Sequence, residues 1–240
     1  IENRAHHNSA VFTDSPQRNF RTAQIDAGMV KKIRKEFNHH FKQEYYENLQ
    51  KEVLETFGEP CGFRISETPV FVSKNLKQEV FEACDAIIQQ LSSINFNQIR
   101  ETFIPKRLQS PLPLERPHFL AIDFGLCNDG KGGITPQLIE LQCFPSLFFY
   151  QPFLGEAFLK NYPTIPKEGF QYYFSNLNKE SYLKTVKDVI VANENPENVV
   201  LLEIYPEQQK TRIDFWATKQ ALGIEVVCIT KVIKEGRKLF

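Results

Sequence analysis

The sequence predicts a mixed fold of the α+β or α/β class, in which long helices accompany a β-hairpin and a C-terminal β-α-β unit. Three observations support this fold class. Apolar residues recur mostly at four-residue steps over residues 30–57, as in an amphipathic helix. Two strand-like runs, 119–124 and 136–142, flank the turn-forming stretch Asn128-Asp-Gly-Lys-Gly-Gly. Residues 198–229 have the pattern of strand, helix, glycine stop and strand.

The remaining helices and connectors are indicated by capping residues and prolines. A helix is expected from Ser73 or Asn75 to Leu91, and another over 181–191. Residues 104–118 hold four prolines and should form an extended connector. Residues 144–174 are rich in aromatic residues and prolines, and we expect irregular structure there with one short helix near 152–159. Residues 1–30 are polar and are expected to form an arm or cap.

The C-terminal unit has the clearest local signals. The run Val-Val-Leu-Leu-Glu-Ile at 199–204 is typical of a buried parallel strand. Thr211 can cap a helix whose first turn contains Asp214, and Gly223 can end that helix. The second strand is expected over 224–229, with Cys228 as a small core residue. Such a unit should be a parallel, Rossmann-like β-α-β with a right-handed crossover.

Composition restricts the class of protein. A chain of 240 residues is long enough for one large or two small domains. Hydrophobic residues make up 42% and charged residues 24%, which favours a globular fold over disorder. The 29 basic and 29 acidic side chains balance, so nothing indicates a general nucleic-acid partner. We also expect no membrane partner, because no apolar run approaches the roughly 20 residues that span a bilayer.

The cysteines and the first residues bear on the cellular compartment. The five cysteines are odd in number and form no CxxC motif, which argues against a disulfide framework or a zinc site. A reducing cytoplasm therefore fits best. The N-terminal residues are polar, without the apolar core of a signal peptide. The chain begins with Ile1 instead of Met, so we expect it to start inside a longer reading frame.

Three polar side chains single out the predicted hairpin. Asp123 is the only carboxylate in its apolar strand, and Glu140 and Gln142 lie two residues apart on the next strand. Strand alternation places Glu140 and Gln142 on one face, with Ile139 and Leu141 pointing into a core. A turn near Gly130 would bring Asp123 opposite Glu140. Clustered oxygen ligands suit a hard cation such as Mg²⁺, although a solvated polar face is the alternative that spacing alone leaves open.

The hairpin resembles the metal-binding signature of the circularly permuted ATP-grasp superfamily, whose members include glutathionylspermidine synthase-like ligases and glutathione synthetase ATP-binding-like proteins. The resemblance lies in Asp123-Phe, then Leu138-Ile-Glu-Leu-Gln, then Pro145-Ser-Leu. It covers about residues 119–155 and implies a circularly permuted, ATP-grasp-like fold. The family positions that hold magnesium at the nucleotide correspond to Asp123, Glu140 and Gln142. Gln142 stands where the family has Asn, and Ala121 stands where it often has Arg.

The resemblance implies a domain order and two cofactors, ATP and Mg²⁺. Residues 1–190 would form a helical N-terminal region with the metal hairpin, and 191–240 would begin a Rossmann-like substrate-side domain. The family's phosphate-binding lid follows that domain, so we expect either that the chain is a fragment or that the protein has lost half of its nucleotide site. The glycines of the hairpin are better explained as turn residues than as a phosphate loop.

Two hypotheses for function follow. The first is an ATP-dependent carboxylate–amine ligase that works through an acylphosphate, with a nucleotide and a small carboxylate and amine as ligands. The second is a non-catalytic ATP-grasp-like scaffold that binds a ligand or a partner chain, which Ala121 favours. Arg64 is a candidate contact for a phosphate or another anion, but a surface salt bridge explains it equally well. The pairs His6-His7 and His39-His40 are expected at the surface.

Overall fold

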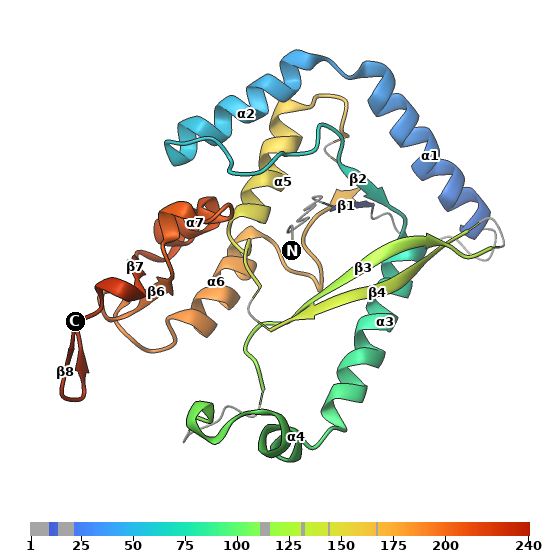
Figure 1. Ribbon diagram of the computed structural model, residues 1–240. Helices are drawn as coiled ribbons and strands as arrows, with labels where there is room; N and C mark the ends of the chain where they lie inside the picture. Colours follow the sequence, from blue (N-terminus) through green and yellow to red (C-terminus); the bar gives the residue numbers. More distant parts are fainter. Residues whose placement is uncertain (1–9, 14–21, 111–115, 131–132, 144, 167) are drawn as a thin grey trace. The chain divides into compact units, whose positions relative to one another are not determined.

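A computed structural model describes residues 10–13, 22–110, 116–130, 133–143, 145–166 and 168–240 of the chain. Seven α-helices and several small sheets occur in these ranges, which confirms a mixed α and β fold (Figure 1). The chain divides into two compact units, Ile1–Ser73 with Ser146–Phe240, and Lys74–Pro145. The domain boundary expected near residue 190 falls within the first unit and stays a prediction. None of the helices in the described ranges combines the length and the apolar character needed to cross a membrane.

The first unit contains most of the secondary structure. Its helices are α1 (Thr22–His40), α2 (Gln43–Phe57), α5 (Tyr150–Asn161), α6 (Lys179–Ile190) and α7 (Arg212–Leu222). Short 3-10 turns are η2 (Pro196–Asn198), η3 (Pro206–Gln208) and η4 (Ile229–Lys231). Its strands are β1 (Ala10–Thr13), β2 (Val70–Val72), β5 (Phe170–Gln171), β6 (Val200–Glu203), β7 (Glu225–Cys228), β8 (Lys234–Glu235) and β9 (Lys238–Leu239).

Three small sheets belong to this unit. In the first, β1 lies between β2 and β5, parallel to β2 and antiparallel to β5. The second joins β6 and β7 in parallel, with α7 between them in the chain, so the predicted β-α-β unit is confirmed. Gly223 ends α7 with a φ of 71°, as its position predicted. The third sheet is the antiparallel pair β8–β9.

The helix expected over residues 30–57 is two helices, α1 and α2, separated at Phe41–Lys42. Four residues of an α-helix turn about 40° more than one full turn, so six such steps would rotate the apolar row by about 240°. One straight helix therefore cannot keep the whole row on one face. The break lets both halves face the same core, where Phe37, Leu49 and Val53 are buried.

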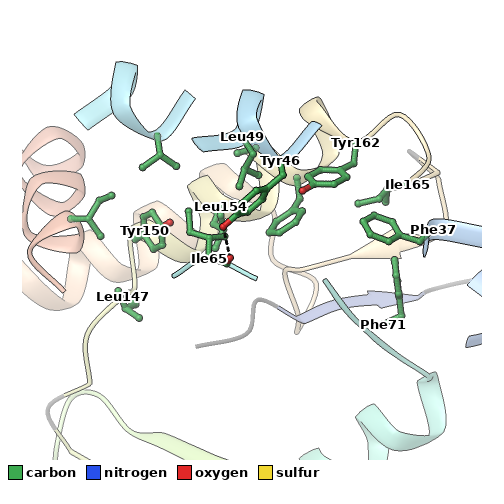
Figure 2. Packing of buried hydrophobic residues seen from close by; sticks show 14 residues of the cluster. Phe37, Tyr46, Leu49, Ile65, Phe71, Leu147, Tyr150, Leu154, Tyr162 and Ile165 are labelled. Carbon is green, nitrogen blue, oxygen red and sulfur yellow. Dashed lines mark hydrogen bonds between the residues drawn. The ribbon is translucent and has the colours of Figure 1, made fainter. Parts of the chain in front are cut away.

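The core of the first unit is strongly aromatic, as Figure 2 shows. Tyr162 of the segment after α5 is fully buried and stacks on Phe37 and Phe158, with ring centroids 5.4 and 5.2 Å apart. The hydroxyl of Tyr46 donates to the carbonyl of Ile65 at 2.8 Å, so this buried polar group has a partner. Phe149, Tyr150 and Phe158, at the start of α5 and within it, are buried as well.

The second unit consists of α3 (Lys74–Ser92), α4 (Phe96–Phe103), the 3-10 turn η1 (Lys106–Leu108), β3 (Ala121–Asn128) and β4 (Ile134–Gln142). Helix α3 confirms the helix expected up to Leu91, and it packs against β4. Helix α4 was not expected; the side chain of Asn95 caps it by accepting from the Gln98 N–H. Among the described residues of this unit, no side chain is fully buried.

The histidine pairs have different outcomes. His39 and His40 are exposed at the end of α1, as expected for surface residues. The ring of His40 is hydrogen-bonded through Nδ1 to the carbonyl of Glu36 at 2.8 Å. His6 and His7 lie outside the described residues.

The candidate metal-binding hairpin

The hairpin is built by a polar turn between two regular strands. The Asp129 N–H donates to the Gly133 carbonyl at 3.2 Å, and the Gly133 N–H donates to Oδ1 of Asp129 at 2.8 Å. Oδ1 of Asn128 accepts the N–H of Gly130, whose φ of 74° favours glycine. The turn residues that predicted a hairpin therefore close β3 onto β4 through their own side chains.

The register of the hairpin brings the three predicted ligands together. Asp123 pairs with Glu140, and Ala121 pairs with Gln142, in an antiparallel ladder. The Gln142 Nε2 group donates to Oδ2 of Asp123 at 3.3 Å and also to Oε1 of Glu140. The prediction that Asp123 and Glu140 share a face of an antiparallel hairpin is thus confirmed, and Gln142 lies on that face with them.

The expected direction of Ile139 is wrong. A β-bulge shifts the register between Asp123 and Phe124, because Phe124 pairs with Leu138 and leaves Ile139 without a partner in the ladder. The extra residue breaks the strict alternation from which a core-facing Ile139 was inferred. Its side chain is 68% exposed, with Cδ1 3.5 Å from where a Cβ on Gly125 would lie. Leu141, which follows the bulge in β4, is half-buried.

The three side chains fit a small divalent cation in chemistry and in charge. Two carboxylates carry a charge of about −2, and Mg²⁺ prefers oxygen ligands. The amide of Gln142 presents nitrogen to both carboxylates, and a half-turn about its last side-chain bond would present Oε1 instead. No group of three or more His, Cys, Asp or Glu side chains in the described ranges is arranged to hold a metal ion. Asp123, Glu140 and Gln142 do not count as such a group, because the side chain of Gln142 is an amide.

Ala121 lies directly opposite Gln142 in the ladder. Its methyl side chain supplies no charge at the edge of the acidic face. The described face of the hairpin therefore combines two negative charges and one neutral amide at the positions that the sequence singled out.

Arg64 lies in the first unit, whereas the hairpin belongs to the second. Its Nη2 donates to Oε1 of Glu67 at 2.6 Å, and the Arg64 side chain is 78% exposed. The hydrogen bond from Arg64 lowers the pKa of the Glu67 carboxyl. This contact is the surface salt bridge that was the alternative explanation for Arg64. A role of Arg64 in binding a phosphate stays a prediction.

Asp214 is a buried carboxylate whose partners the sequence did not indicate. Its Oδ2 accepts the N–H of Leu147 at 2.7 Å, and its Oδ1 accepts those of Phe149 and Tyr150 at 3.0 and 2.8 Å. Burial raises the pKa of Asp214, and the three N–H donors oppose that rise. Asp214 thus caps α5 from another helix and also holds Leu147, the last residue of the Pro145-Ser-Leu segment.

The N-terminal cap observed on α7 differs from the cap that the sequence predicted. Thr211 occupies the N-cap position, but its side chain makes no capping hydrogen bond. Asp214 of the first turn is directed to α5 and not to its own helix. An acidic residue in the first turn, within the apolar run Ile213-Asp-Phe-Trp, was the one available sign of a buried role.

No family model matches the chain, and comparisons with curated proteins and with solved structures found no match. The ATP-grasp resemblance therefore rests on the residues of the hairpin and of the segment after it.

Proposed function

We propose that the chain carries the magnesium-binding hairpin of an ATP-grasp-type carboxylate–amine ligase. The observation that carries the proposal is the convergence of Asp123, Glu140 and Gln142 on one face of an antiparallel hairpin. The sequence resemblance assigns these same three positions to the metal. A solvated polar face with this register would also bring the three side chains together, so magnesium binding is the measurement that separates the two explanations.

In the proposed reaction a substrate carboxylate oxygen attacks the γ-phosphorus of ATP, and the bond to the ADP oxygen breaks. The amine nitrogen then attacks the acyl carbon, loses a proton, and displaces inorganic phosphate. Magnesium, when bound, would neutralise charge on the transferred phosphoryl group. Asp123, Glu140 and Gln142 would hold it, and the fixed hairpin register would keep their oxygens on one side of the nucleotide.

The second candidate is a non-catalytic relative that binds a ligand on the same hairpin. Ala121 favours it, because the family often has an Arg at the corresponding position. The two candidates share the cation site and differ in turnover. Release of phosphate from ATP by the complete protein, in the presence of a carboxylate and an amine, would favour the ligase.

Calorimetric titration of the protein with MgCl₂ and with MgATP tests the shared site. We expect Glu140→Gln to abolish magnesium-dependent nucleotide binding while the free energy of unfolding changes little, because Glu140 is exposed and its replacement leaves no cavity. Glu101→Gln is the matched control, since Glu101 is an exposed residue of α4 in the same unit. Equal affinities of the wild type and Glu140→Gln would favour a solvated face and refute the proposal.

A further inference from the structure

The first unit has an open pocket at the break between α1 and α2. Its cavity volume is about 360 Å³, and sites for small organic molecules usually measure about 300 to 1,000 Å³. The pocket is formed by residues on both sides of the break and by the loop before β2, and the described lining residues are Asn38, Phe41, Gln43, Glu67 and Thr68. None of them belongs to residues 191–240, where the chain is expected to continue into a longer domain.

The walls of this pocket are held by the core and by local polar contacts. Phe41 is half-buried and packs against the buried aromatic cluster. The guanidinium of Arg64 donates to the carboxylate of Glu67 at 2.6 Å. The hydroxyl of Ser66 donates to the carbonyl of Thr68 at 2.9 Å, which fixes the turn of the loop. Walls that are fixed before a ligand arrives reduce the conformational entropy that binding costs.

The charges at the pocket disfavour two classes of small ligand. An anion would meet the carboxylate of Glu67, and none of the described lining residues is Lys, Arg or His. Lys42, which lies next to the lining in the sequence, directs its ammonium nitrogen over the ring of Tyr45, 5.7 Å from the ring centre. An organic cation would need a carboxylate of its own, and the charge of Glu67 is already matched by Arg64. A neutral ligand therefore fits the pocket best.

The polar side chains of the lining suit a ligand with several hydroxyl groups. The amides of Asn38 and Gln43 each offer two donors and one acceptor. The hydroxyl of Thr68 can donate and accept, and the carboxylate of Glu67 accepts. Neighbouring hydroxyl groups on a sugar ring can donate to one such side chain and accept from another. The ring of Phe41 adds an apolar surface, against which the C–H groups of a sugar can pack.

We propose that this pocket binds a neutral monosaccharide. Asn38, Gln43 and Glu67 bond its hydroxyl groups, and Phe41 contacts the less polar face of the sugar ring. The proposal is independent of the hairpin and of its metal, because the hairpin belongs to the other unit.

The test is saturation-transfer difference NMR on the full chain, with glucose, galactose, mannose and N-acetylglucosamine as separate probes. We expect signals from the ring protons of at least one of these sugars. Asn38→Ala and Gln43→Ala should each weaken its binding by about fivefold, the equivalent of one net hydrogen bond. Gln50→Ala is the matched control, since Gln50 is also an exposed glutamine of α2 and is not among the described lining residues.

The two variants keep the test independent of folding, because Asn38 and Gln43 are exposed and their replacement leaves the core intact. Absence of signals for all four sugars would overturn the proposal, and so would equal affinity of the wild type and both variants. Inorganic phosphate and n-butylamine are the charged probes. If either of them bound more tightly than every sugar and Gln43→Ala weakened that binding, the proposal would also be wrong, because the occupant would then carry a charge.

Discussion

Replacement of Asp214 by alanine should be among the most damaging single changes in the first unit. The carboxylate is buried and accepts three backbone N–H groups at 2.7 to 3.0 Å. Each buried donor left without a partner costs about 1–3 kcal/mol. The cost is partly offset, because the variant no longer buries a carboxylate. We therefore expect Asp214→Ala to lower the free energy of unfolding by about 3–5 kcal/mol, the lower part of the sum for three unpaired donors.

Urea denaturation followed by far-UV circular dichroism measures this loss. Asp188→Ala is the control, since Asp188 is an exposed residue of α6 that pairs with Lys184, and its loss should cost less than about 1 kcal/mol. Asp214→Asn should fall between the two, because its one amide oxygen can serve only some of the three donors. A stability of Asp214→Ala within about 1 kcal/mol of the wild type would refute the assignment of Asp214 as the anchor of α5.

Two further predictions concern packing and catalysis. Gly155→Ala should destabilise the chain by about 1–3 kcal/mol, because a Cβ there would lie 2.7 Å from the ring of Tyr172; Tyr172→Leu in the same chain should recover part of the loss on urea denaturation. The 240-residue chain should release no phosphate from ATP above background, because phosphoryl transfer needs cationic groups on the phosphates and Ala121 supplies none. Phosphate release that Asp123→Ala silences would contradict this expectation.

The hairpin could be predicted from the sequence because the residues that determine it are close together in the chain. The turn residues around Gly130 bond to their own neighbours, and alternation predicted which polar side chains share a face. The bulge could not be predicted, because a strand with one extra residue, here Ile139, has the same apolar composition as a regular strand. Only the pairing of Phe124 with Leu138 shows where the extra residue lies.

Long-range partners explain the other differences. The carboxylate of Asp214 and the N–H of Tyr150 are 64 residues apart in the chain, so no window of sequence contains both. The strand at 199–204 was expected to be buried because it is continuously apolar. Such a run indicates that both faces of the strand carry apolar side chains, but it does not indicate that both faces are covered. Whether a second layer covers Leu202 depends on what packs there, and its 48% exposure shows an open face.

The charge of the hairpin also limits the order in which ligands can bind. Asp123 and Glu140 present two carboxylates on one face, and the amide of Gln142 is neutral. Two like charges 4 Å apart repel by about 4 kcal/mol near a protein surface, so a triphosphate should not approach this face without a cation. ATP in EDTA should therefore show no measurable affinity, whereas the same nucleotide with magnesium should bind. Equal binding in the two conditions would place the nucleotide away from the hairpin, and the acidic face would then have to be explained as a solvated surface.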